Sequence, residues 1–81
     1  MRLDKYLKVS RLIKRRTVAN EACDAGKVFV NGRAARASYE VRVGDQISLH
    51  FGVRELTVEV LSLSETAGKS EAGMLYREIP S

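Results

Sequence analysis

The sequence has few of the residues that mark several classes of protein: no tryptophan, one proline, one histidine and one cysteine among 81 residues. A lone cysteine cannot form an internal disulfide, which fits a reducing compartment. No apolar run approaches the ~20 residues of a membrane-spanning helix, and the charged start lacks the apolar core of a signal peptide. We therefore expect a small cytoplasmic protein with no membrane partner.

Charge is distributed unevenly along the chain. Residues 1–36 carry ten lysines and arginines against three acidic residues, a balance of +7, whereas residues 37–81 carry four against seven, a balance of −3. A strongly basic half is the electrostatic pattern of a nucleic-acid-binding protein. The alternative is a solvated surface kept for solubility. The predominance of arginine on one half of the chain favours nucleic-acid binding.

The first segment has the periodicity of a helix. Leu3, Tyr6 and Leu7 share one helical face, which predicts a short helix with Tyr6 directed toward the core. Asp4 lies four residues before Lys8, a spacing at which the two side chains can pair.

A second helix is predicted over about residues 18–25 by an apolar stripe at helical spacing. Thr17 precedes it as the expected N-cap, because its hydroxyl can accept hydrogen bonds from the N–H groups of the first turn. Gly26 follows where a left-handed residue commonly ends a helix. Cys23 lies on the apolar stripe, so we interpret it as a core residue rather than a nucleophile.

From residue 27 the hydrophobic period changes to two residues, as in a strand with one buried face. Asn31-Gly32 is a strong hairpin signal, because both residues tolerate positive φ. Further strands are expected at residues 46–51 and 56–60. Two short N-terminal helices packed on one side of a small antiparallel sheet make an α+β fold.

The composition changes after residue 63. Serine, threonine and glycine become frequent, and only a few large apolar residues near the end could be buried. We expect residues 1–63 to form a single domain and residues 64–81 to form a flexible or weakly docked C-terminal tail.

Candidate catalytic and metal-ligating residues are few. Cys23 and His50 each stand alone, whereas a metal site needs several His, Cys or carboxylate ligands at defined spacing. His50 is expected at an outward or edge position of a strand, where a surface or RNA-contacting role suits it better than unassisted base catalysis. We therefore expect no enzyme activity, no metal and no cofactor.

The basic residues gather in a pattern that suits RNA. Lys14, Arg15 and Arg16 directly precede the second helix, whose free N–H groups and dipole also favour an anion. Arginine adds planar, bidentate contacts to phosphate. Duplex RNA is recognised mainly through its shape, phosphates and 2′-hydroxyls, which a rigid cationic surface can contact. The predicted RNA-binding residues are Arg2, Lys5, Lys8, Arg11, Lys14, Arg15, Arg16, Thr17, Arg33 and Arg36.

Several short motifs occur together in the N-terminal half. In order they are Arg2-Leu3-Asp4-Lys5, Ser10-Arg11, Gly26-Lys27-Val28, Val30-Asn31-Gly32 and Gly44-Asp45-x-Ile47. In this combination they resemble the S-four domain, an RNA-binding module also called the αL motif, over residues 1 to about 50. Among its stand-alone members, the start Arg2-Leu3-Asp4-Lys5 and the stretch Lys14-Arg15-Arg16-Thr17 are similar to the heat-shock protein fifteen family. The longer stretch from Lys8 to Thr17 is still closer to the bacterial ribosome-associated quality-control P family.

This resemblance implies a non-enzymatic factor that binds large ribosomal subunits obstructed by peptidyl-tRNA. The implied partners are 23S rRNA, the P-site tRNA and the elongation protein that adds alanine tails to stalled chains. We expect the protein to be a monomer. Position by position, Arg2 and Arg16 match the residues expected to grip the rRNA and tRNA backbone. The surrounding basic positions are Lys5, Arg11, Lys14 and Arg15.

Two other functions fit the same sequence. One is a stand-alone RNA-binding module that recruits an RNA-modifying enzyme. The other is a protein-interaction adaptor that uses the strand Leu56–Val60 as an exposed edge. Binding that survives high salt would favour the adaptor, since binding through phosphates weakens steeply as salt increases.

Overall fold

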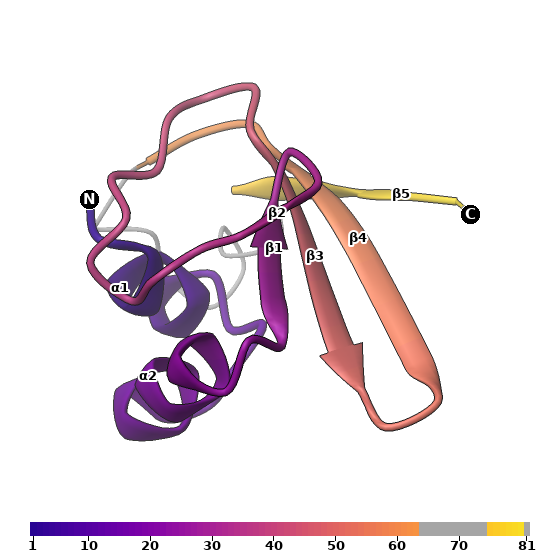
Figure 1. Ribbon diagram of the computed structural model, residues 1–81. Coiled ribbons are helices and arrows are strands. Elements are labelled where there is room, and N and C mark those ends of the chain that lie inside the picture. Colours follow the sequence, from indigo (N-terminus) through magenta and orange to yellow (C-terminus); the bar gives the residue numbers. More distant parts are fainter. Residues whose placement is uncertain (64–74, 81) are drawn as a thin grey trace.

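The computed structural model describes residues 1–63 and 75–80 as two helices on one side of a five-stranded antiparallel sheet (Figure 1). This is the α+β architecture that the sequence predicts. The elements follow one another as α1 (Leu3–Val9), α2 (Arg16–Asp24), β1 (Val28–Val30), β2 (Arg33–Ala34), β3 (Gln46–Phe51), β4 (Arg54–Val60) and β5 (Tyr76–Ile79).

Helix α1 forms where the sequence periodicity predicts it. Leu3, Tyr6 and Leu7 are all 0% exposed and belong to the single core shared by helices and sheet. Removing one such side chain from water is worth about 1.5–3 kcal/mol, so packing rather than intrinsic propensity holds this seven-residue helix. The predicted burial of Tyr6 is confirmed.

Helix α2 begins at Arg16, and the prediction that Thr17 caps it is wrong. The cap residue is Arg15, which has extended backbone angles (φ −122°, ψ 136°) and makes no side-chain cap hydrogen bond. Thr17 is therefore the second residue of the helix, two positions beyond the cap, and its hydroxyl cannot cap the N–H groups of the first turn.

The end of α2 agrees with the prediction. Gly26 has φ 73°, and its N–H donates to the carbonyl of Cys23 at 3.0 Å. The next N–H, from Lys27, donates to the carbonyl of Ala22 at 3.0 Å. These two bonds form a Schellman motif, which satisfies the last carbonyls of the helix and turns the chain into β1.

The sheet has the strand order β2-β1-β3-β4-β5, with antiparallel neighbours throughout. Val28 and Val30 of β1 lie opposite Leu49 and Ile47 of β3, so the buried faces of the two strands coincide. Positive φ at both turn residues (52° and 84°) confirms the hairpin predicted at Asn31-Gly32.

Strand β4 is not an edge, so the adaptor hypothesis loses the surface on which it was based. β4 pairs with β3 along one side and with β5 along the other. Within residues 1–63 and 75–80, the outer strands of the sheet are β2 and β5.

Strand β5 adds residues beyond position 63 to the sheet. Leu75, just before it, is 2% exposed, and its carbonyl accepts a hydrogen bond of 2.6 Å from the buried Tyr6 hydroxyl. The C-terminal strand is thus joined directly to α1. The mobility expected of the stretch 64–74 falls outside the described residues, and the division between a domain and a tail stays a prediction.

Candidate nucleic-acid interface

The first turn of α1 places a buried carboxylate between arginines from two parts of the chain. Asp4 accepts hydrogen bonds from the backbone N–H of Lys5 at 2.8 Å and from the Asn20 amide nitrogen at 3.3 Å. Its Oδ1 also lies 3.3 Å from Arg2 Nε and 3.4 Å from Arg16 Nη2. We call Asp4, Arg2, Arg16 and Asn20 the Asp4 cluster.

The surroundings of Asp4 keep its carboxylate ionised at neutral pH. Burial alone would raise the pKa of Asp4, but hydrogen bonds from Asn20, Arg16 and the Lys5 backbone outweigh burial and lower the pKa below its ordinary value. The side chains of Arg2 and Arg16 nevertheless remain 50% and 45% exposed. Each guanidinium is therefore held on one side by the carboxylate and keeps N–H donors for a second anion on the other.

The predicted pair between Asp4 and Lys8 is wrong. The Asp4 side chain is only 3% exposed, whereas Lys8 is exposed to solvent. The partners of Asp4 on α2 lie 12 and 16 residues away in the chain, at Arg16 and Asn20. Only the packing of α1 against α2 brings them together, so spacing within one helix could not reveal them. Sequence reasoning accordingly missed Asn20.

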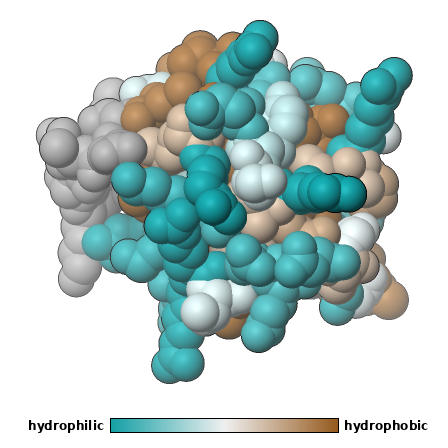
Figure 2. Space-filling view, turned by 60° about the vertical axis from the view of Figure 1, so that its left-hand side comes forward, coloured by the Kyte–Doolittle hydropathy of each residue, from teal (hydrophilic) through white to brown (hydrophobic). Residues whose placement is uncertain are grey.

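The solvent-facing side of α1 is basic. Lys5 is partly exposed and Lys8 is exposed, and both follow Arg2 at intervals of three residues. Figure 2, which brings the left-hand side of Figure 1 forward, shows hydrophilic side chains over much of this side of the molecule. The structure therefore brings Arg2 and Arg16 together at Asp4 and places Lys5 and Lys8 further along α1.

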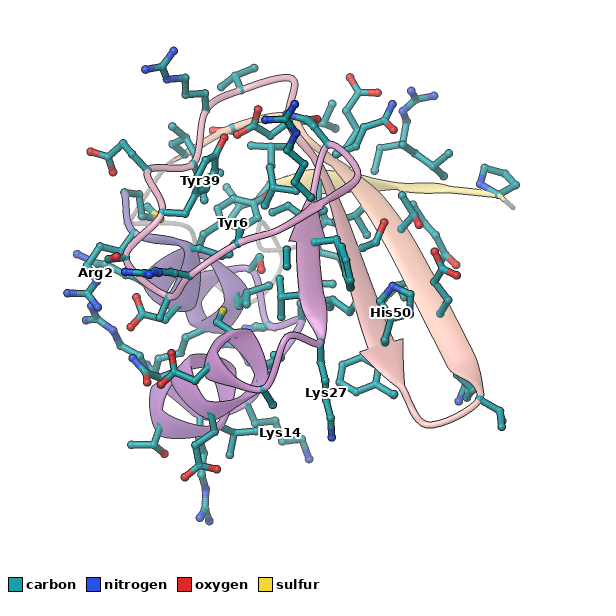
Figure 3. The ribbon with its side chains drawn as sticks, viewed as in Figure 1. Arg2, Tyr6, Lys14, Lys27, Tyr39 and His50 are labelled. Atoms are coloured by element: carbon teal, nitrogen blue, oxygen red, sulfur yellow. The ribbon has the colours of Figure 1, made fainter. Side chains whose placement is uncertain are left out.

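The segment between the helices carries the other predicted cations. Arg11 adopts a left-handed conformation (φ 64°), with its N–H donating to the Lys8 carbonyl at 3.0 Å, and so turns the chain out of α1. Lys14 and Arg15 are exposed. In Figure 3, however, Lys14 points toward the lower part of the molecule and away from Arg2. The structure does not bring Lys14 to the Asp4 cluster.

Thr17 lies beside the Asp4 cluster despite losing its predicted capping role. Together with Asp4, Arg16, Asn20 and Glu21 it lines a shallow pocket of about 400 Å³. Its exposed hydroxyl is thus available next to the guanidinium of Arg16.

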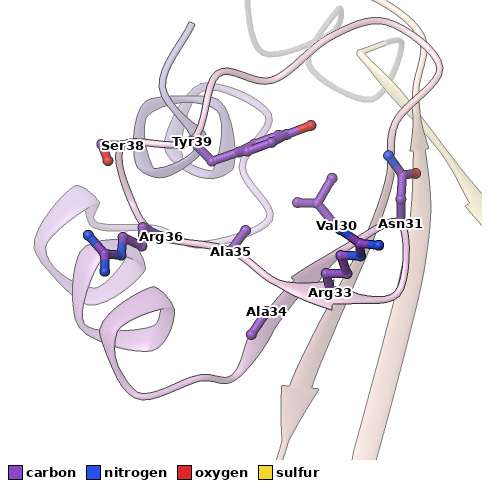
Figure 4. A pocket seen from close by; sticks show the side chains of 8 residues that line it. All are labelled: Val30, Asn31, Arg33, Ala34, Ala35, Arg36, Ser38 and Tyr39. Atoms are coloured by element: carbon purple, nitrogen blue, oxygen red, sulfur yellow. The ribbon is translucent and has the colours of Figure 1, made fainter.

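The predicted cations after the hairpin reach the same region by a different route. The N–H groups of Leu3 and Asp4 donate to the carbonyls of Tyr39 at 2.8 Å and Ala37 at 3.2 Å. The segment after β2 therefore lies against the first turn of α1. Arg36, next to Ala37, points toward the helices, whereas Arg33 lies at the β1–β2 turn (Figure 4).

The remaining reactive residues show no catalytic grouping. Cys23 is 5% exposed, and its burial raises the pKa of the thiol to about 11, as expected for a core residue. His50 lies on β3, an inner strand, so of its two predicted positions, outward or edge, the edge is wrong; it follows the buried Leu49 and therefore points outward. Its ring packs edge-on against Phe29, with the ring centroids 4.9 Å apart. Among the described residues, no group of three His, Cys, Asp or Glu is placed to hold a metal ion.

None of the helices in the described part of the chain has the length and apolar character needed to cross a membrane.

Comparison with known proteins agrees with the resemblance read from the sequence. Residues 1–47 match the S4 domain family. The RQC P-site tRNA stabilizing factor of Halalkalibacterium halodurans is 53% identical over 76 residues, which cover 94% of this chain and 86% of that protein. The factor of the same name from Bacillus subtilis is 51% identical over 76 residues, covering 94% of this chain and 88% of the other.

A solved structure shares the fold. The structure described as trimeric Vibrio cholerae Heat Shock Protein 15 superposes with a TM-score of 0.89 at 40% sequence identity, covering 98% of this chain and 81% of that one. The family match over residues 1–47 and the close similarity to these relatives show that the chain belongs to the S4 domain family, among the RQC P-site tRNA stabilizing factors.

Proposed function

We propose that this protein is a non-enzymatic factor of ribosome-associated quality control that binds large ribosomal subunits obstructed by peptidyl-tRNA. On the subunit it contacts 23S rRNA and the P-site tRNA, and it supports the partner that elongates alanine tails on stalled chains. The observation that carries the proposal is the Asp4 cluster, in which one buried carboxylate holds two half-exposed guanidiniums. The names of the related P-site tRNA stabilizing factors support the same function.

The Asp4 cluster suits a phosphate backbone better than freely moving surface cations would. Immobilising a long side chain on binding costs about 0.5–1.5 kcal/mol, and the contacts of Arg2 and Arg16 with Asp4 reduce the freedom that remains to be lost. Arg16 is also the first residue of α2, where free backbone N–H groups and the helix dipole favour the same anion.

The neighbouring cations extend this surface. Lys5 and Lys8 on α1 can approach further phosphates of a folded RNA. Such a surface reads RNA by shape and charge rather than by base sequence. A factor that works on ribosomes acts in the cytoplasm, and we propose that it binds as a monomer. The trimer named for the Vibrio cholerae protein makes light scattering of the purified chain the appropriate check.

Sedimentation with purified large subunits, prepared with and without P-site tRNA, tests the proposed function. The protein should sediment with tRNA-carrying subunits at low salt and be released as salt increases, because each phosphate contact adds about 0.7–0.9 to the log–log slope. The Arg2→Gln/Arg16→Gln variant should lose binding. As a control that removes the same charge, Arg54→Gln/Arg77→Gln changes exposed residues on β4 and β5 and should bind normally.

Two results would refute the proposal. One is recovery of the wild-type protein only in fractions free of ribosomal subunits. The other is an equal loss of binding in both double variants, since net charge rather than the Asp4 cluster would then decide the interaction.

A further inference from the structure

A second basic feature lies beside the Asp4 cluster. It is a groove of about 680 Å³ between the β1–β2 turn and the segment that follows β2, which we call the hairpin groove (Figure 4). Val30 and Asn31 line it from the hairpin, and Tyr39 lines it from the opposite segment. Arg33 and Arg36 are the charged residues that border it, and no acidic residue does. The groove thus combines apolar walls with a cationic rim.

The two arginines of the hairpin groove are available to a ligand. Arg33 and Arg36 are exposed, and within residues 1–63 and 75–80 neither side chain makes a hydrogen bond or an ion pair. This distinguishes them from Arg2 and Arg16, which the carboxylate of Asp4 already engages. Their full charge and all their N–H donors can therefore act on a bound anion.

A single carboxylate behind the groove fixes its two walls. Asp45 Oδ1 accepts a hydrogen bond from the Asn31 amide nitrogen at 3.1 Å, and Asp45 Oδ2 accepts one from the Tyr39 hydroxyl at 2.9 Å. Asp45 is 9% exposed, and the backbone N–H of Arg42 also donates to it at 3.0 Å. These bonds occupy the carboxylate and hold the tyrosine ring in place, so the groove exists before any ligand arrives.

The shape and chemistry of the groove match one unpaired nucleotide. Proteins bind single-stranded RNA by placing bases on aromatic or apolar surfaces and phosphates on nearby cations, which is what Tyr39 and the two arginines offer. The groove volume lies within the ~300–1,000 Å³ typical of sites for small ligands. A base paired inside a duplex cannot enter it, because its faces are covered by stacking.

We propose that the hairpin groove binds an unpaired nucleotide, with its base against Tyr39 and its flanking phosphates on Arg33 and Arg36. This inference rests on the proposed function, because it specifies an RNA element that the protein contacts next to the Asp4 cluster. Tyr39 is also tied to the first turn of α1 by the 2.8 Å bond from the Leu3 N–H. Groove and cluster therefore have a fixed separation, and one RNA that exposes a base beside a helical backbone can occupy both.

Fluorescence anisotropy with the full chain tests this site, using hexauridylate as the single-stranded probe and a blunt RNA duplex as the comparison. Arg33→Gln/Arg36→Gln should weaken hexauridylate binding by at least about tenfold. It should make the log–log salt slope shallower by about 1.4, since each single-strand phosphate contact contributes about 0.7. Duplex binding should weaken much less. Arg54→Gln/Arg77→Gln removes the same charge from β4 and β5 and should bind hexauridylate like the wild type.

A cross-link provides a second measurement that does not depend on a variant. Hexauridylate that contains 4-thiouridine should attach to the peptide that carries Tyr39 when irradiated on the folded wild-type protein. Attachment only at other sites would overturn the proposal. Two results with the variants would also overturn it: Arg33→Gln/Arg36→Gln losing equal affinity for hexauridylate and for the duplex, or Arg54→Gln/Arg77→Gln losing as much hexauridylate affinity as Arg33→Gln/Arg36→Gln. So would two results with the wild-type protein: no measurable hexauridylate binding at low salt, or competition by hexaglutamate as effective as that by hexauridylate.

Failure of this inference and failure of the proposed function would look different. If the groove does not bind unpaired RNA, the wild-type protein still sediments with tRNA-carrying subunits and still depends on Arg2 and Arg16. If the protein does not sediment with those subunits at all, the proposed function fails whatever the anisotropy measurements show.

Discussion

Replacing Asp4 by asparagine separates two explanations of RNA binding that otherwise predict the same behaviour. The substitution removes a negative charge from the basic surface, so attraction by net charge alone predicts tighter binding. In the structure, however, the same carboxylate holds the guanidiniums of Arg2 and Arg16. If their positions matter more than net charge, Asp4→Asn should weaken binding.

The magnitudes favour weaker binding. A unit charge about 7 Å from a phosphate in water contributes about 0.6 kcal/mol, which is the gain expected from removing the carboxylate. Without the carboxylate, the side chains of Arg2 and Arg16 are no longer ordered in the free protein. Immobilising each of them on RNA then costs about 0.5–1.5 kcal/mol of binding free energy. The sum of about 1–3 kcal/mol corresponds to roughly 5- to 150-fold in affinity. Subtracting the gain of about 0.6 kcal/mol leaves a net loss of about 0.4–2.4 kcal/mol, so Asp4→Asn should bind large subunits roughly 2- to 60-fold more weakly.

Stability must be measured beside affinity, because Asp4 is buried. Hydrogen bonds to a charged group contribute about 1.5–3 kcal/mol to stability. Because Arg2 and Arg16 are half exposed, Asp4→Asn should lower the free energy of unfolding by an amount at the lower end of that range. Urea denaturation measures how much of each variant is folded, so that binding is compared between folded proteins. Asp24→Asn is the matched control, since it removes an exposed acid at the end of α2 and should bind equally or slightly more tightly. Unchanged or tighter binding by folded Asp4→Asn would refute the ordering role of Asp4.

Three further predictions concern stability and can be checked by urea denaturation. Tyr6→Phe should cost about 0.5–1.5 kcal/mol rather than more, because the Leu75 carbonyl that loses the Tyr6 hydroxyl still accepts two backbone N–H bonds; a loss above about 3 kcal/mol would contradict this. Leu7→Ala should cost about 2–5 kcal/mol at a site that is 0% exposed, and a negligible loss would show that it is not core. The pKa values of Asp4 and Asp45 lie below the ordinary 3.8, so their contribution to stability is present above that pH and is lost as pH falls further. Stability that stays constant between pH 4 and about pH 2 would contradict it.

The sequence predicted features whose causes lie within a few neighbouring residues. The spacing of Leu3, Tyr6 and Leu7 is enough to define the buried side of α1, and Asn31-Gly32 is enough to define the hairpin. In each case the determining interaction is short in sequence, so a pattern reveals it.

Features that depend on tertiary packing could not be read in this way. The sequence predicted Thr17 as the cap of a helix that starts at residue 18, but α2 begins at Arg16, two residues earlier. Spacing within α1 predicted that Asp4 pairs with Lys8, but Asp4 binds Arg16 and Asn20 of α2 instead. The strand Leu56–Val60 was predicted as an edge because no pattern in its own residues indicates that Tyr76–Ile79 pairs with it. Each error arose where a residue distant in sequence becomes a neighbour in space.

Tethered hydroxyl-radical probing on large subunits that carry P-site tRNA tests the central claim most directly. Cys23 is buried, so a cysteine introduced by Thr17→Cys beside the Asp4 cluster, or by Val53→Cys at the fully exposed β3–β4 turn, can be labelled selectively with an iron chelate. We predict cleavage of 23S rRNA and of the tRNA from position 17 and no comparable cleavage from position 53. Cleavage from position 53 with none from position 17 would contradict the proposal that the helix side of the protein faces the RNA.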